Sequence, residues 1–556
     1  MKTAKMTGLA VTLVAALAPA AAHAAEFSVT RADDPAFNDC DPGDCSLRGA
    51  VVAANVSPGP DVVRAPAGTY SLTIDSTSLD MFNEHFRGDL DVTDDLTIRP
   101  DVADGQVVID AAGNEDRGIE VGAGLRLENV VVGNGNAPVD ADNLARGGGI
   151  SVHPSAALTM HGGGLTGNHA DQSSPINGVG GGIYSEGAVT LQDTLINANT
   201  AKPAGFGGGL YFTGAGSVAT VLTSTFRANE AAGGGAISGA NGGSVNLAES
   251  RLGRNIATST SGGGVFVRDG STASLYNTNV DNNQANGNSG GGIRAIEADV
   301  VLRNTTVTGN AAPDGGGISS TDNLPDDHAF TLENTIVADN RDIGTTGETY
   351  NDCRDVGTTI SVESLGHNLV GSEFGCSIVT KKPSDQIGSG VDGSQPPIIP
   401  LLTTEGYYGG PNFILSNGLQ PQSPAVNAGP KGQRCDSTTD IRGVPRPFGK
   451  RCDIGAYELA RCKGVIVNRV GTPGEDLESD LRMQPTIIGD GFLGFAGPDG
   501  MRGAEGDDAL CGGEGKDTLK GEDGNDTLVG GKGKDVCIGG PGTDRAKGCE
   551  VERSIP

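Results

Sequence analysis

The chain has 556 residues, of which 90 are glycine, and its 69 acidic and 39 basic residues give a net charge of −30. This charge excludes a general nucleic-acid-binding role, because neutralising phosphates needs a basic surface. The glycines do not recur at every third position, which excludes collagen. Apolar residues make up 36% of the chain, which is low for one compact core but too high for a disordered acidic tail. A repetitive fold is therefore the first possibility to test along the chain.

Residues 1–24 have the pattern of a signal peptide. Lys2 and Lys5 precede an apolar run over residues 9–22, and residues 22–24 supply a small-residue cleavage site. The alternative is a membrane anchor, but the run is short and rich in alanine. No later segment has 18 uncharged apolar residues, so we expect no transmembrane span in the mature chain. The sequence predicts Sec-dependent export to the cell surface or the extracellular medium.

An exported chain can form disulfides. All ten cysteines follow residue 24, and no CxxC pair with zinc spacing occurs, so we expect bridges rather than a cysteine-bound metal. We expect nearest neighbours to pair as Cys40–Cys45, Cys353–Cys376 and Cys435–Cys452. The sequence leaves the pairing of the remaining cysteines open.

Residues 25–120 are expected to hold an N-terminal cap and the first coils of a repetitive fold. Leu47, Ala50, Val51 and Ala54 are spaced i, i+3, i+4 and i+7, which is one apolar face of a short helix. A solenoid needs such a cap, because an open coil exposes unpaired strand edges.

Residues 121–345 repeat with a period of about 27 residues. A run of three small residues, mostly glycine, recurs before an apolar residue, and these apolar residues are Ile150, Ile183, Leu210, Ile237, Val265, Ile293 and Ile318. A second series keeps step with the first, in which a short apolar strand ends at an asparagine: Asn134, Asn168, Asn199, Asn229, Asn255, Asn283, Asn310 and Asn340. Between the two series, apolar and polar residues alternate as in strands with one buried face.

These repeats predict an all-β fold, a right-handed parallel β-helix with a short N-terminal capping helix. A unit of this length cannot bury its own apolar face, so successive units must stack. Glycine supplies corners with positive φ, and each asparagine tolerates such a corner while its amide pairs with the asparagine stacked above it. Eight coils at a strand spacing of about 4.8 Å would span roughly 40 Å.

Several motifs resemble known families. Cys45-Ser46-Leu47-Arg48-Gly49-Ala50 closely resembles the CSLREA motif of bacterial secreted β-helix proteins, and the glycine-rich repeats resemble those of polymorphic outer-membrane proteins. The segments 366–371, 423–429 and 452–458 resemble the choice-of-anchor-Q region. This resemblance implies a secreted surface protein and implies that residues 346–458 close the far end of the helix. It implies no reaction.

Residues 491–549 form a second repetitive region, which follows an expected linker at 459–490. Aspartates recur every nine residues without error, at Asp499, Asp508, Asp517, Asp526, Asp535 and Asp544. Each copy also places glycines at fixed offsets, clearest at Gly512, Gly515, Gly521, Gly524, Gly530 and Gly533. The pattern resembles the RTX, or haemolysin-type, nonapeptide G-G-x-G-x-D-x-U-x. The bland alternative is an acidic glycine-rich linker.

The resemblance implies a small parallel β-roll that binds several calcium ions through these aspartates and glycines. Glycine corners let backbone carbonyls converge, and the aspartates add hard carboxylate ligands. Two nonapeptides make one coil, so we expect Asp508 to share an ion with Asp526, and Asp517 with Asp535. The inward positions are Leu510, Leu519, Leu528 and Cys537. This core is thin, so we expect folding to depend on the metal.

We find no catalytic motif and expect no enzyme. His153, His161 and His169 are eight residues apart, but strand positions this far apart face different ways. Asp94-Asp95 and Asp326-Asp327 read as solvated turns rather than as catalytic or cation-binding pairs. The sequence favours a secreted calcium-binding structural or adhesive protein whose partner is an extracellular polysaccharide or protein. A calcium-dependent polysaccharide lyase or epimerase is the alternative.

Overall fold

The computed structural model describes residues 24–35, 40–74, 88–140, 143–171, 177–321, 329–344, 351–355, 362–375, 378–388, 396–408, 414–431, 435, 437–472, 474–477 and 490–555. The expected signal peptide, Cys376 and the Asp326-Asp327 turn lie outside these residues. No helix in the described part of the chain is long and apolar enough to cross a membrane.

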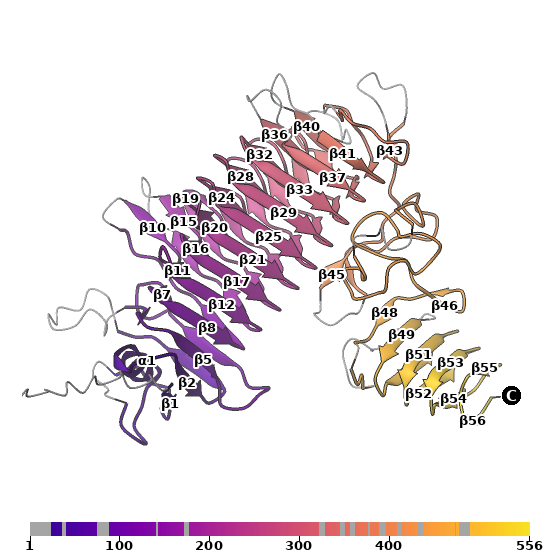
Figure 1. Ribbon diagram of the computed structural model, residues 1–556, viewed down its shortest axis with the longest axis horizontal. Helices are drawn as coiled ribbons and strands as arrows, with labels where there is room; N and C mark the ends of the chain where they lie inside the picture. Colours follow the sequence, from indigo (N-terminus) through magenta and orange to yellow (C-terminus); the bar gives the residue numbers. More distant parts are fainter. Residues whose placement is uncertain are drawn as a thin grey trace, which may run out of the picture.

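The described chain is almost entirely β-structure, and most of it forms a parallel β-helix (Figure 1). The first of its sheets has twelve strands in the order β1(Glu26–Ser28), β2(Asp61–Ala65), β5(Leu96–Pro100), β8(Gly124–Glu128), β12(Ala157–His161), β17(Ala188–Gln192), β21(Val218–Leu222), β25(Ser244–Ala248), β29(Thr272–Tyr276), β33(Asp299–Arg303), β37(Phe330–Glu333) and β41(Val362–Gly366). The second also has twelve, in the order β3(Gly68–Ser71), β6(Val107–Asp110), β9(Val130–Gly133), β13(Gly164–Thr166), β18(Leu195–Asn197), β22(Thr225–Arg227), β26(Arg251–Gly253), β30(Asn279–Asp281), β34(Thr306–Thr308), β38(Ile336–Val337), β42(Leu369–Val370) and β43(Gln386–Ile387).

Two further sheets run along the solenoid, beginning at Leu90 and at Leu144. The third has ten strands: β4(Leu90–Val92), β7(Ile119–Val121), β11(Ile150–Val152), β16(Ile183–Ser185), β20(Leu210–Thr213), β24(Ile237–Ala240), β28(Val265–Arg268), β32(Ile293–Ile296), β36(Ile318–Thr321) and β40(Cys353–Asp355). The fourth comprises β10(Leu144–Arg146), β14(His169–Asp171), β15(Asn177–Val179), β19(Thr200–Phe206), β23(Glu230–Gly233), β27(Ile256–Ala257), β31(Gln284–Ala285), β35(Ala311–Ala312) and β39(Arg341–Asp342). Every strand pair in these four sheets is parallel, which confirms the predicted β-helix.

The predicted pairing of stacked amides is present as a buried asparagine ladder, but the prediction that these asparagines themselves take a positive φ is wrong. The positive φ falls on the residue before each ladder asparagine, for example on Arg254 before Asn255. For each ladder asparagine from Asn168 to Asn310, the backbone N–H and the side-chain Nδ2 donate to Oδ1 of the asparagine one coil further on. Asn134 is an exception, because its side chain is exposed and it lies one residue before the ladder position. Gly135 occupies that position, and its N–H donates to Asn168 Oδ1. At the other end, Asp352 takes the place of an asparagine and accepts from Asn340.

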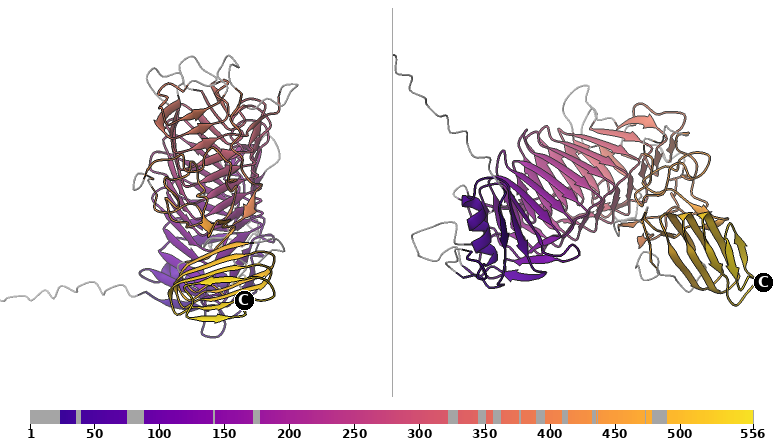
Figure 2. Two further views of the ribbon diagram at one scale, coloured as in Figure 1. Left: turned by 90° about the vertical axis from the view of Figure 1, so that its right-hand side faces the viewer. Right: turned by 60° about the horizontal axis from the view of Figure 1, so that its bottom comes forward.

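The N-terminal cap is also confirmed. Helix α1(Leu47–Val56) buries the four predicted apolar residues Leu47, Ala50, Val51 and Ala54, and Ser46 caps it by accepting the Gly49 N–H. The Cys40–Cys45 disulfide precedes it. The helix lies against the N-terminal end of the solenoid, at the indigo end of Figure 2.

The far end differs from the sequence prediction. Only residues up to 388 continue the coils, ending with β43, whereas residues 396–458 run back along the side of the solenoid (Figure 1). We call the described part of 396–458 the strap. It contains the antiparallel pair β44(Gly406–Tyr407) and β45(Leu415–Ser416), and the predicted Cys435–Cys452 disulfide. The choice-of-anchor-Q-like segments 423–429 and 452–458 therefore lie on the side of the helix, not on its end.

Polar corners and an apolar patch hold the strap. Asn277, Asn304 and Asn334 donate their side-chain amides to strap residues that are 119 to 162 positions away in sequence. The apolar patch consists of Ile336 and Leu369, which pack in one buried cluster with strap residues such as Tyr457.

Beyond the strap, the segment expected as a linker contains β46(Arg461–Cys462), β47(Val465–Ile466) and β48(Arg469–Val470). A small roll follows, with β49(Gly491–Ala496), β51(Ala509–Gly515), β53(Thr527–Gly533) and β55(Arg545–Lys547) in one sheet after β48, and β50(Gly500–Glu505), β52(Thr518–Asp523), β54(Val536–Ile538) and β56(Val551–Arg553) in the other. The Cys462–Cys511 disulfide joins β46 to β51. Figure 2 shows the roll beside the solenoid, at the end of the strap.

Candidate metal centre

Each coil of the C-terminal roll contains 18 residues, as two nonapeptides require. Within the sheets, Leu510 pairs with Leu528 and Leu519 with Cys537. The predicted inward residues are fully buried, together with Phe492 and Met501. Cys537 also forms a disulfide with Cys549, which closes the last turn. The core consists of one column of side chains from each of the two sheets, so it is thin and the turns at its edges must contribute to stability.

The six predicted aspartates lie in these turns and are at most 3% exposed. They stack in the predicted register. The Asp508 N–H donates to Asp526 Oδ1 at 2.9 Å, and the Asp517 N–H donates to Asp535 Oδ1 at 3.0 Å. Asp499 and Asp526 donate in the same way to Asp517 and Asp544. The stacking is thus observed, while calcium ligation by these particular residues stays a prediction.

The second oxygen of every one of these carboxylates has no hydrogen-bond partner. These buried Oδ2 atoms belong to Asp499, Asp508, Asp517, Asp526, Asp535 and Asp544. A buried charged oxygen without a partner is costly, unless a cation or a donor compensates it. Carboxylate and carbonyl oxygens are the ligands that Ca²⁺ prefers. The donor set therefore fits a row of calcium ions along each edge of the roll.

The glycines leave the space that these oxygens need. A Cβ on Gly512 would lie 2.3 Å from Asp517 Oδ2, and Gly521 and Gly530 stand in the same relation to Asp526 and Asp535. The other glycine column faces the stacked backbone. A Cβ on Gly515, Gly524 or Gly533 would lie within 2 Å of a carbonyl oxygen one coil earlier, and all three have positive φ. A side chain at any of these glycines would therefore occupy the space beside the aspartate Oδ2 atoms or the stacked carbonyl oxygens.

The electrostatics also favour a bound cation. Burial raises the pKa of Asp499 and of Asp508 to about 7, and repulsion from neighbouring carboxylates adds to the rise. Burial likewise raises the pKa of Asp526 to about 6, and repulsion from Asp544 contributes. A divalent cation between the stacked turns would stabilise the ionised carboxylates that burial disfavours.

A comparison with protein-family models matches residues 494–519 and 512–546 to the RTX calcium-binding nonapeptide repeat. The roll is a calcium-binding RTX module. No curated protein matches the chain. Among solved structures, the crystal structure of the Dettilon tailspike protein is similar, with 12% sequence identity and a TM-score of 0.26. The match covers 61% of this chain and 65% of the tailspike chain, which is less than two thirds of its length.

Outside the RTX module, the three histidines do not converge. His153 contacts Glu120, His161 lies 3.4 Å from Asp193, and His169 is hydrogen-bonded to Thr200 Oγ1. Each histidine therefore has a separate partner, as the sequence analysis expects.

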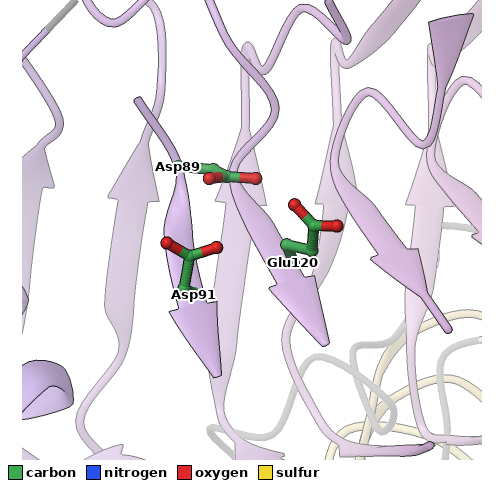
Figure 3. A group of neighbouring side chains, drawn as sticks. All are labelled: Asp89, Asp91 and Glu120. Carbon is green, nitrogen blue, oxygen red and sulfur yellow. The ribbon is translucent and has the colours of Figure 1, made fainter. Parts of the chain in front are cut away.

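A group of acidic residues that the sequence analysis missed lies near the N-terminal end of the solenoid. Figure 3 shows the carboxylate of Asp89 just before β4, that of Asp91 on β4, and that of Glu120 on the neighbouring β7. Their nearest oxygens lie within 4.8 Å of one another. Arg117 contacts two of them, with its Nη1 2.9 Å from Glu120 and its Nε 3.7 Å from Asp89. Burial, and repulsion from Asp116, raise the pKa of Asp89. Asp91 and Glu120 are register partners in the parallel pair β4 and β7. The sequence does not reveal this proximity, because it does not show where these two coils begin.

One groove of about 490 Å³ lies between the strap and the solenoid. Arg254 and Arg341 line it together with Asp339 and Glu405. Arg254 pairs with Glu405 at 3.0 Å, whereas burial raises the pKa of Asp339. The groove thus places cationic and acidic side chains together on an otherwise strongly acidic protein.

Proposed function

We propose that this protein is a secreted or cell-surface calcium-binding structural element with an adhesive role towards an extracellular polysaccharide or protein. The observation that carries the proposal is the RTX module with its six unpartnered, buried carboxylate oxygens, attached through the strap to a long parallel β-helix. Calcium would rigidify the module, and the solenoid would present an extended surface.

Two other features support a location outside the cytoplasm. Four described disulfides join Cys40–Cys45, Cys435–Cys452, Cys462–Cys511 and Cys537–Cys549, and such bonds persist in oxidising compartments. The signal-peptide pattern that the sequence predicts at residues 1–24 is also typical of an exported chain. Millimolar calcium, which weak extracellular sites need, is available there.

The calcium part of the proposal is tested on the full chain by far-ultraviolet circular dichroism. We expect the calcium-free protein to gain β signal when about 1 mM Ca²⁺ is added. The double variant Asp517→Ala plus Asp526→Ala should abolish this gain, because it removes one carboxylate from each edge of the roll. The matched control is Glu505→Ala plus Asp523→Ala, which removes two exposed, paired acidic side chains and should respond like the wild type. An unchanged response of the first variant would contradict the proposal.

The adhesive part is tested by retention of the calcium-loaded full chain on immobilised acidic glycans and on cell surfaces. We expect retention in calcium and release by a chelator. If the protein is retained equally with and without calcium, the RTX module has no part in adhesion.

A second candidate function is a calcium-dependent polysaccharide lyase or epimerase. The groove between strap and solenoid favours it, since Arg341 beside Asp339 offers a cation for a sugar carboxylate and an acid with a raised pKa. Incubation with acidic glycans in calcium would yield unsaturated or epimerised products under this alternative. These products should disappear in Asp339→Asn and Arg341→Ala. We expect no product from the wild type.

A further inference from the structure

The segment just before the matched repeats contains a turn of the same kind. Residues 471–476 read Gly-Thr-Pro-Gly-Glu-Asp, which places Gly471, Gly474 and Asp476 at the offsets of the first glycine, the later glycine and the aspartate in each nonapeptide. The spacing from Asp476 to Asp499 is 23 residues rather than 18, so a nine-residue period misses it. The family match begins only at residue 494.

The backbone of this turn bonds to the next turn in the way that the recognised turns bond to each other. The Asp476 N–H donates to Asp499 Oδ1 at 3.1 Å, as the Asp499 N–H donates to Asp517 Oδ1 at 3.0 Å. The Gly500 N–H donates to the Asp476 carbonyl at 2.6 Å, as the Thr518 N–H donates to the Asp499 carbonyl at 2.7 Å. Strand β48 before the turn pairs in parallel with β49. The turn therefore occupies the next position in the stack.

The glycine geometry is repeated too. A Cβ on Gly471 would lie 2.3 Å from Asp476 Oδ2, the same distance that separates a Cβ on Gly494 from Asp499 Oδ2. A Cβ on Gly497 would lie 2.5 Å from the Gly474 carbonyl oxygen, so this carbonyl faces the 494–499 turn as the Gly497 carbonyl faces Gly515.

The pair of turns also has the oxygen donors of a calcium site. Asp499 is 2% exposed, its Oδ1 faces the 471–476 turn through the Asp476 N–H, and its Oδ2 has no partner. Asp476 is 1% exposed; its Oδ2 accepts from the Thr472 N–H and its Oδ1 from the Thr472 hydroxyl, but each carboxylate oxygen keeps a second lone pair for a cation. Two buried carboxylates and a nearby carbonyl oxygen are ligands that Ca²⁺ prefers, and a cation between them would compensate the buried negative charge.

We propose that the described residues 471–472 and 474–476 belong to an additional calcium-binding turn, so that one Ca²⁺ binds between them and residues 494–499. The inference rests on the proposed calcium binding of the RTX module and extends it into the segment that joins the module to the strap. The Cys462–Cys511 disulfide ties the segment before this turn to β51 of the roll. A calcium ion at the additional site would therefore order the segment that joins the strap to the roll, as well as the roll itself. Calcium would then fix the attachment of the module.

The test is the number of calcium ions bound per full chain, measured by equilibrium dialysis and atomic emission. We expect Asp476→Asn to bind one ion fewer than the wild type, because asparagine keeps the shape of the side chain but loses its charge. The matched control is Glu475→Gln, since Glu475 is the exposed neighbour and its loss removes the same charge. This control should bind the wild-type number.

The outcomes separate this inference from the function on which it rests. If the wild type binds calcium and Asp476→Asn binds the same number, the additional site is wrong and the RTX module stands. If Asp476→Asn loses every ion, the turn is a structural part of the roll rather than a separate site, which also overturns the inference. A wild type that binds no calcium would overturn both. The Asp517→Ala plus Asp526→Ala variant serves as the reference for loss of the recognised sites.

Discussion

At the scale of single residues, the buried asparagine ladder is the feature on which the solenoid depends. Each member serves two coils. Asn255 accepts from the Asn229 N–H and side chain, donates to Asn283 Oδ1, and also donates to the Phe226 carbonyl. The ladder thus satisfies backbone groups at corners where the strands cannot pair.

Replacing one ladder asparagine should therefore lower the free energy of unfolding. Asn255→Ala leaves the buried Asn229 N–H and the Phe226 carbonyl without their partners, at about 1–3 kcal/mol for each unsatisfied group. We expect the free energy of unfolding of the solenoid to fall by about 2–6 kcal/mol, measured from the urea midpoint. Asn246→Ala is the control, because Asn246 is exposed on β25. Equal midpoints for the two variants would show that the ladder contributes little.

The ladder ends at Asp352, which is completely buried. Burial raises its pKa to about 7, and nearby Asp339 adds to the rise, although the N–H groups of Asn340 and Ser372 oppose it. An unfolded aspartate titrates near 3.9. Between about pH 4 and 7 the folded chain therefore holds one proton more than the unfolded chain, so the contribution of this residue to stability falls as the pH rises.

Asp352→Asn removes this titration. We expect the difference in free energy of unfolding between variant and wild type to shift in favour of the variant from pH 5 to pH 8. Urea midpoints at the two pH values measure the shift. The ladder variant Asn255→Ala introduces no ionisable group, and its difference from the wild type should be the same at both. A constant difference for Asp352→Asn would mean that Asp352 is already ionised at pH 5.

At the scale of elements, the sequence was sufficient wherever the pattern is local and periodic. The face of α1, the coil strands and the stacked aspartates all follow from fixed spacings between apolar residues, glycines and polar corners. The strap could not be found in this way, because contacts such as Asn277 to Ser437 join residues 160 positions apart and use single polar groups without a period. The nine-residue period does not predict the turn at 471–476 for a related reason, since a longer connection separates Asp476 from Asp499.

A buried ion-pair network fixes the strap at one point. Arg251 is fully buried and pairs with Asp281 and, across the interface, with Glu405 at 2.8 Å. Arg254 also pairs with Glu405. Removing one member of such a network leaves buried charge uncompensated.

Glu405→Ala should consequently loosen the strap without unfolding the solenoid. We expect hydrogen exchange to become about tenfold faster or more in β44 and β45, which corresponds to a local loss of at least about 1.4 kcal/mol. Exchange in β25 and β29 should not change. The control is Glu186→Ala, an exposed glutamate of the solenoid. Faster exchange throughout the solenoid would show that the strap is part of its cooperative unit.

At the scale of the whole molecule, two stacks of parallel strands with different chemistry share one chain. The solenoid has a continuous apolar core that reaches from Val29 to Ile378, whereas the core of the RTX module has only six fully buried side chains. A separate cluster that includes Val444, Val470 and Ala509 joins the module to the strap. The solenoid can therefore be stable without metal, while the module combines a thin core with stacked carboxylates.

This difference predicts two unfolding transitions in calorimetry. Calcium binds the folded module and not its unfolded form, so saturation at about 100 times the dissociation constant adds about 2.7 kcal/mol for each site. We expect a chelator to lower the transition of the module and to leave that of the solenoid in place. In Asp517→Ala plus Asp526→Ala, the lower transition should no longer respond to calcium. If calcium instead moved both transitions together, the strap and the Cys462–Cys511 bond would couple the module and the solenoid into one cooperative unit. Calcium would then control the stability of the entire protein.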